Sequence, residues 1–291
     1  MIAGLVLLVG GAAAGMFGSL LGLGGGILIV PLLTLGFGLP LREAVAVSLV
    51  SVIVTSSASA AVYLQRHVAN LRLGMVLELF SAAGALVGGL IAFMINEQVL
   101  AGMFAALVTW TAVSMARRKD APKTASPAPV AASSEASAPV AAPLDGFPID
   151  SPPRDDGTFT GSLSGPGYRI HSLPLGMAGS VFAGINSALL GVGGGIVKVP
   201  VMHLMMGVPL RVSTATSNMM MGITATSSAV IYLLRGSIDP YIAGPIALGV
   251  FVGATVGSRV AHRIHVRVLR WLFVAVLAYT AVEMARKALG L

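Results

Sequence analysis

The sequence contains no cysteine and very little charge. Only 10% of its 291 residues are Asp, Glu, Lys or Arg, whereas 56% are hydrophobic and the mean hydropathy is +0.90. A water-soluble globular chain normally carries about 25% charged residues, so a soluble enzyme is not expected. The absence of cysteine excludes disulfides, thiol nucleophiles and Cys-type metal sites.

Charge is also missing from long continuous stretches of the chain. The first charged side chain is Arg42, and four later stretches hold none: residues 79–96, 98–116, 212–234 and 240–258. Each is long enough to cross a hydrocarbon layer of about 30 Å as a helix. We therefore predict an all-α polytopic membrane protein whose partner is the lipid bilayer.

The charge that is present is mostly positive. The formal net charge is +7, but the basic residues lie between the apolar stretches and form no single patch. This distribution is typical of signals that orient a membrane protein, and nucleic-acid binding is not expected.

The sequence repeats itself at a separation of 169 residues. Residues 20–66 align with residues 189–235 without a gap and with 22 identities in 47 positions. LLGLGGGILIVP, from residue 20, matches LLGVGGGIVKVP, from residue 189, and the later identities include a Pro-Leu-Arg at residues 40–42. The chain therefore consists of two homologous halves.

Residues 120–169 separate the halves and hold nine of the sixteen prolines and six of the eleven acidic residues. The segment is rich in Ala and Ser and has no apolar period, which is typical of a flexible linker. We expect three regions: a first transmembrane repeat (1–117), a linker (118–171) and a second transmembrane repeat (172–291).

Each half is predicted to contain four membrane segments, of which the first is broken by glycines. The broken segments lie at residues 3–38 and 172–207. The uninterrupted helices are expected at residues 41–64, 73–95, 98–116, 210–234, 240–261 and 268–286.

The orientation of the halves depends on how the broken segment crosses. If it crosses once the halves are parallel, and if it enters and returns they are inverted. We counted the Arg and Lys residues in loops outside the linker on each side of the membrane. In the inverted arrangement seven lie on the linker side and four on the opposite side. In the parallel arrangement the corresponding numbers are five and six. The positive-inside rule therefore favours inverted repeats with a cytoplasmic linker.

The glycine runs are the most unusual local feature. Each glycine costs a helix about 1 kcal/mol relative to Ala, so both first segments are expected to break. Broken backbone at membrane depth survives only where it lines a cavity or is buried in protein. The half-helix that follows each run would direct free N–H groups into that cavity, which suits an anion. The alternative is that the glycines only permit close helix packing.

Taken together, these motifs resemble the sulfite exporter TauE/SafE-type permeases of the 4-toluene sulfonate uptake permease superfamily. The resemblance rests on the paired GLGGGILIVP and GVGGGIVKVP motifs, the Pro-Leu-Arg that follows, and the Ala-x-Ser tracts at residues 46–48 and 215–217. It covers both halves and omits the linker. It implies transport of a sulfur-containing anion across the cytoplasmic (inner) membrane of a prokaryote.

Lys198 is the one cation placed well inside a charge-poor span. It follows Gly195 by three residues, and its counterpart in the first half is Ile29. An unpaired lysine costs about 3 kcal/mol on insertion into a membrane, so a function or a partner is expected. We expect it to neutralise a bound anion; the alternatives are that it snorkels to an interface or pairs with an acid such as Glu78.

Hydroxyl and amide side chains follow the broken segments and could donate hydrogen bonds to an oxyanion. Ser48 and Thr55 in the first half are seven residues apart, as are Ser217 and Thr224 in the second, so each pair shares one helix face. The alternative is that they satisfy carbonyls of their own helix. The expected substrate-binding residues are Gly24, Gly25, Gly26, Gly193, Gly194, Gly195, Lys198, Ser48, Thr55, Ser217, Asn218 and Thr224.

The remaining titratable residues suggest no catalysis. His203 is interpreted as a packing residue rather than a proton carrier, and Glu78 as a solvated residue at the membrane interface. Motifs for metal or nucleotide binding are missing, so neither enzyme activity nor a metal or cofactor is expected. The sequence predicts a secondary transporter for a small anion of the sulfite or organosulfonate class; the alternative is an anion-selective channel. A homo-oligomer is compatible with this prediction.

Overall fold

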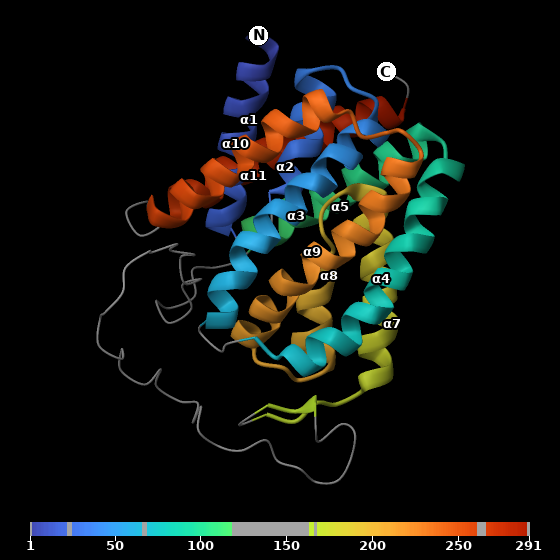
Figure 1. The fold of residues 1–291 in the computed structure, drawn as a ribbon, viewed down its shortest axis with the longest axis vertical. Coiled ribbons are helices and arrows are strands. Elements are labelled where there is room, and N and C mark those ends of the chain that lie inside the picture. Colours follow the sequence, from blue (N-terminus) through green and yellow to red (C-terminus); the bar gives the residue numbers. More distant parts are fainter. Residues whose placement is uncertain are drawn as a thin grey trace.

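The computed structural model describes residues 2–21, 25–65, 69–117, 163–165, 168–260 and 266–289. The described chain is built from α-helices and two short π-helices, η1 and η2 (Figure 1). The first half contains α1 (Ile2–Leu21), α2 (Gly26–Pro31), η1 (Leu32–Gly36), α3 (Leu41–Gln65), α4 (Leu71–Met94) and α5 (Glu97–Arg117). The second contains α7 (Leu173–Leu190), α8 (Gly195–Pro200), η2 (Val201–Met205), α9 (Leu210–Leu234), α10 (Pro240–Val260) and α11 (Val266–Ala288).

The helices have the length and surface of membrane segments. Four described stretches are long and apolar enough to cross a membrane: Leu41–Ala58, Leu71–Met94, Glu97–Ser114 and Leu173–Leu190. Large apolar side chains also point outward, as at Leu79, Met94 and Leu248. The prediction of an all-α protein with several apolar helices is confirmed.

The two halves have the same order of elements with the same spacing. The helices α8, η2 and α9 begin and end 169 residues after α2, η1 and α3, respectively. Pro31 and Pro200 end the short helices and precede the π-helical turns, because proline has no N–H with which to continue the α-helical ladder.

The broken first segment of each half turns back on itself. Gly10 of α1 lies against Leu32 of η1, while Gly25 lies against Ala14, so the chain after the break runs antiparallel to α1. In the second half Gly179 lies against Val201 and Gly194 against Ala183.

This reversal changes the count of segments. Among the described residues each half has five helical stretches, because α2–η1 and α8–η2 are separate returning elements. The sequence prediction counted each broken segment once and so arrived at four. The reversal follows from glycines with positive φ at the breaks, which a straight broken helix would not need.

The halves interlock rather than forming two separate bundles. The first helix of each half packs on the other half, α1 along α10 and α7 along α4, and the pairs α3–α9 and α5–α11 also join the halves. Figure 1 shows α3 descending while α4 and α9 rise, so the equivalent helices α3 and α9 run in opposite directions.

Glycines allow the closest of these contacts. On α1, Gly11 and Gly15 lie against the backbone of Ile246 and Val250 in α10. On α4, Gly84 meets the backbone of Val181 in α7. Small residues four apart are a common way to bring membrane helices into backbone contact.

Part of the expected linker is packed against the helices. Leu163 and Ile170 are buried in a small apolar cluster, which we call the linker-side cluster. Its members are Leu73, Leu77, Leu163, Ile170, Leu173, Met202, Met206, Val208 and Met220. Asn70 Nδ2 donates to Leu163 O at 2.8 Å and to the Tyr168 hydroxyl at 2.7 Å. Burial raises the pKa of the Tyr168 phenol, which therefore stays neutral.

The expectation of a flexible linker up to residue 171 therefore needs correction for residues 163–165 and 168–171. The two apolar residues stand isolated among polar ones in the sequence, but they find apolar partners on α4, η2 and α9 that are distant along the chain. Residues 118–162 lie outside the described part of the structure.

We predict that Gly15→Ala destabilises the protein. A Cβ atom at residue 15 would overlap the Val250 carbonyl, and overpacking of this kind costs about 1–3 kcal/mol. Gly4→Ala on the same helix is the control, because nothing lies within 4 Å of its Cβ position and alanine favours the helix. Thermal unfolding in detergent should show a lower midpoint for Gly15→Ala alone; equal midpoints would contradict the close packing of α1 on α10.

Candidate substrate site

The two glycine runs meet in the interior. A Cβ atom at Gly26 would lie 2.5 Å from the carbonyl oxygen of Gly191, so no other residue fits there without a shift of backbone. The second run is not helical: Gly191, Gly193 and Gly194 have φ values of 69°, 77° and 72°. Of the glycines proposed as binding residues, Gly24 lies outside the described residues.

Ser48 joins the two runs. Its Oγ lies 2.8 Å from Gly191 O and 3.1 Å from Gly26 O, and the residue is fully buried. A hydroxyl has one proton, so it donates to one of the two carbonyls at a time. The carbonyl of Gly191, at the end of α7, thus gains a donor from α3.

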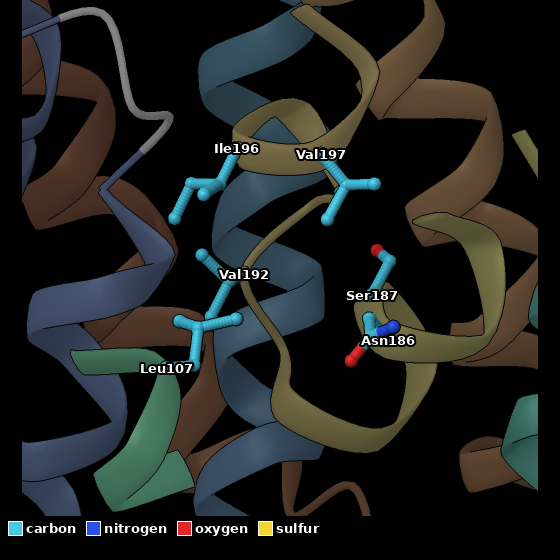
Figure 2. A pocket seen from close by; sticks show the side chains of 7 residues that line it. Leu107, Asn186, Ser187, Val192, Ile196 and Val197 are labelled. Atoms are coloured by element: carbon cyan, nitrogen blue, oxygen red, sulfur yellow. The ribbon is translucent and has the colours of Figure 1, made fainter. Parts of the chain in front are cut away.

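A small hollow lies beside the second run. Its volume is about 10 Å³, and it is lined by Leu107, Asn186, Ser187, Val192, Gly194, Ile196 and Val197. Figure 2 shows the polar Asn186 and Ser187 on one side and apolar side chains around the rest. A space of about 10 Å³ holds about one water molecule, so an anion would need the lining side chains to move apart.

Two buried hydroxyls near the hollow have no partner. The Ser187 and Ser217 side chains, both almost completely buried, form no hydrogen bond to another described residue. A Cβ atom added to Gly194 would lie 3.4 Å from the Ser187 Cβ. A Cβ atom added to Gly195 would lie 3.4 Å from the Ser217 Oγ. Buried polar groups normally have hydrogen-bond partners. A spare donor beside Gly194 and another beside Gly195 therefore indicate a place where a small polar ligand could bind.

Asn186 and Ser187 were missed by the sequence prediction. Their counterparts in the first half are Phe17 and Gly18, so a search for residues shared by both halves passes over them. The available signal was a pair of adjacent polar residues directly before the break in an otherwise apolar helix.

Lys198 forms a buried ion pair. Its Nζ lies 3.0 Å from Glu78 Oε2 and donates to Thr224 Oγ1 at 2.6 Å. Thr224 Oγ1 in turn donates to Glu78 Oε1 at 2.6 Å, which closes a ring of three side chains from α8, α4 and α9. Lys198 is 1% exposed, so it does not snorkel to an interface. Of the three expectations for Lys198, pairing with Glu78 is the one observed in this structure.

The prediction for Glu78 was wrong. A solvated position at the interface was expected, but Glu78 is 4% exposed and sits among α4, α8 and α9. The error arose because its partner lies 120 residues away in the sequence.

The ion pair is not repeated at the equivalent positions of the two halves. The counterparts of Lys198 and Glu78 are Ile29 and Ala247, and Ile29 is fully buried in the apolar core. Thr55, the counterpart of Thr224, donates to Ser51 O of its own helix at 3.1 Å. The repeat is therefore broken chemically at this point.

The other predicted residues lie around the glycine runs. Asn218 is buried on α9, and its carbonyl accepts a hydrogen bond from Ser56 of α3. His203 is exposed, and its Nδ1 lies 2.9 Å from Val208 O. Among the described residues no group of three or more His, Asp or Glu is placed to hold a metal ion.

Interlocked apolar helices around glycine breaks, with polar groups buried at the breaks, are the architecture of a membrane transporter. A family model described as "Sulfite exporter TauE/SafE" matches residues 7–284. The chain belongs to this family, and the resemblance noted in the sequence is confirmed.

Known relatives carry transporter names. "Probable membrane transporter protein YunE" of Bacillus subtilis is 23% identical over 275 residues, which cover 91% of this chain and 90% of the relative. "Probable membrane transporter protein MamO" of Paramagnetospirillum magneticum is 29% identical over 97% of this chain but 44% of its own length. "Probable membrane transporter protein MamO" of Magnetospirillum gryphiswaldense is 27% identical over 94% of this chain and 43% of its own length.

The chain thus spans less than half of both MamO proteins and most of YunE. No solved structure matches it. The family and the names of the relatives indicate a membrane transporter rather than an enzyme.

We predict that Ser48→Ala lowers stability, because the buried Gly191 carbonyl at the end of α7 would lose this donor. A buried polar group left without a partner costs about 1–3 kcal/mol. Ser51→Ala is the matched control: Ser51 is equally buried, but its hydroxyl donates only to Val47 O of its own helix. The midpoint of thermal unfolding should fall clearly for Ser48→Ala and little for Ser51→Ala; the reverse order would refute the role of Ser48.

Proposed function

We propose that the protein is a secondary carrier for a small sulfur-containing anion, of the sulfite or organosulfonate class, in the inner membrane of a prokaryotic cell. The anion would be held where the two glycine runs meet, between the halves. The observation that carries this proposal is the pair of unpartnered buried hydroxyls, Ser187 and Ser217, beside Gly194 and Gly195. Neutral donors of this kind suit the oxygens of a sulfite or sulfonate group.

Lys198 supplies the charge in this proposal. It stands on the first turn after Gly195 and it is buried, with its ammonium group beside Thr224. A charge-assisted hydrogen bond from an ammonium group is roughly twice as strong as a neutral one. Gly24, Gly25, Gly26, Gly193, Ser48, Thr55, Asn218 and Thr224 would complete or support the site, as the sequence predicted.

The arrangement of the halves supports a carrier. Equivalent helices at a spacing of 169 residues run in opposite directions, which is the relation expected of inverted repeats. In carriers of this type one half or bundle rocks against the other around a midplane site. An anion-selective channel would need a continuous open pathway, whereas the hollow beside the glycines has a volume of only about 10 Å³, which supports a carrier.

The test of the proposed function is binding and transport by the purified chain. In liposomes, sulfite, methanesulfonate, sulfoacetate and taurine can each be offered outside against unlabelled substrate inside. Saturable exchange would support a carrier, whereas flux that does not saturate would support a channel. No flux with any of the four compounds would refute the substrate class.

We predict that Lys198→Met weakens anion binding about tenfold to a hundredfold, as expected for the loss of about 1.5–3 kcal/mol from a charge-assisted hydrogen bond. Ile29→Val is the matched control, because Ile29 is the equivalent buried residue of the first half. Calorimetry on purified protein measures both affinities. Unchanged affinity in a folded Lys198→Met variant would mean that Lys198 does not hold the anion.

A further inference from the structure

We propose that Glu78 is an internal counter-ion that releases Lys198 to the substrate anion by taking up a proton, so that one anion and one proton cross the membrane together. This inference rests on the proposed function, in which Lys198 binds the anion. It adds the coupling ion, the stoichiometry and the residue that carries the proton.

The geometry places a carboxylate where the anion would bind. Glu78 presents one oxygen to Lys198 Nζ at 3.0 Å and the other to the Thr224 hydroxyl at 2.6 Å. A sulfonate or sulfite group also presents several oxygens to donors, so it could use the same two partners. The two anions therefore compete for Lys198, and the substrate must displace Glu78.

Among the described side chains of the elements around it, a displaced Glu78 would find no other buried cation. The other described ionisable side chains on the elements around it, α4, α7, α8, η2 and α9, are Arg72, His203 and Tyr232. Arg72 and His203 are exposed, and the Tyr232 hydroxyl donates to Ala188 O at 3.0 Å. A buried carboxylate without a partner is so costly that it takes up a proton instead.

The charges balance in this exchange. Before binding, the site holds one carboxylate and one ammonium and is neutral. After binding, it holds a neutral carboxylic acid, the ammonium and a monovalent anion, and is again neutral. Alternating access of such a site needs no uncompensated charge in the low-dielectric interior, which removes a large electrostatic barrier.

The stoichiometry follows from the asymmetry of the repeat. Ile29 in the first half and Ala247 in the second occupy the positions equivalent to Lys198 and Glu78, so the chain contains this pair once in its described part. One chain therefore carries one coupled proton for each anion.

The pair is closed from the linker side in this structure. Leu73 and Leu77 precede Glu78 on α4, and Met202 and Met206 follow Lys198 along the same returning element. All four belong to the linker-side cluster, which also contains Leu163 and Ile170. The apolar cluster thus lies between the ion pair and that end of the molecule.

Methanesulfonate is the probe, because it remains a monoanion at every pH used. For the unsubstituted protein we expect its dissociation constant to rise about tenfold for each pH unit where Glu78 must take up a proton, by linkage between the two ligands. In Glu78→Gln, which mimics the protonated acid, binding should be independent of pH. Glu283→Gln changes a partly exposed acid of α11 that pairs with Arg286, and this variant should behave like the unsubstituted protein.

Transport provides the second measurement. With the membrane potential clamped at zero, an acid exterior should drive accumulation of methanesulfonate by the unsubstituted protein. Glu78→Gln should retain exchange of labelled for unlabelled anion but lose this accumulation. Accumulation by Glu78→Gln, or its pH-dependent binding, would overturn the inference.

A measurement without any variant protects the test if Glu78→Gln fails to fold. Methanesulfonate added to unsubstituted protein in weak buffer should cause uptake of about one proton per anion bound, reported by a pH indicator. Binding without proton uptake would overturn this inference and leave the proposed function intact. Absence of both binding and exchange would refute the proposed organosulfonate substrate and this inference together.

Discussion

The close approach of Gly26 to the carbonyl of Gly191 is the constraint on which the rest of the structure depends. Two segments that are not helical can lie inside an apolar protein only if their polar backbone groups find partners. The Ser48 hydroxyl lies between both segments and donates to one carbonyl at a time, and the returning helices α2 and α8 begin immediately after the breaks. Ser48 of the first half thus supplies a donor to the break of the second half, which joins the two halves at this point.

The same arrangement separates structural from chemical roles. The first half contributes Ser48, which joins the breaks, and Glu78, whose carboxylate reaches into the second half. The second half contributes Lys198, Thr224 and the spare hydroxyls of Ser187 and Ser217. A duplicated scaffold thus carries a single charged centre, which a substrate anion can use only by disturbing the existing ion pair.

Much of the scaffold could be predicted from sequence. The 169-residue repeat places α8, η2 and α9 at the bounds set by their first-half equivalents, and the glycine runs mark where the first helices end. These features are local or periodic, so a single sequence reveals them. The family was recognised from the same motifs, and the family model matches.

The site could be predicted only in part. Lys198 stood out because an isolated charge in an apolar span needs an explanation, but its partnership with Glu78 depends on how α4 crosses α8 and α9. Ser187 was missed because its first-half equivalent is glycine, and Leu163 and Ile170 because their partners are distant in sequence. Contacts between distant segments, and departures from the repeat, carry no periodic signal.

The most direct test of this account is infrared difference spectroscopy of the purified protein with and without methanesulfonate. If the anion takes Lys198 from Glu78, binding should produce the carbonyl stretch of a protonated carboxylic acid, and Glu78→Gln should lack this band. A spectrum in which the carboxylate bands stay unchanged while the anion binds would contradict it, because the ion pair between Glu78 and Lys198 would then persist in the loaded carrier.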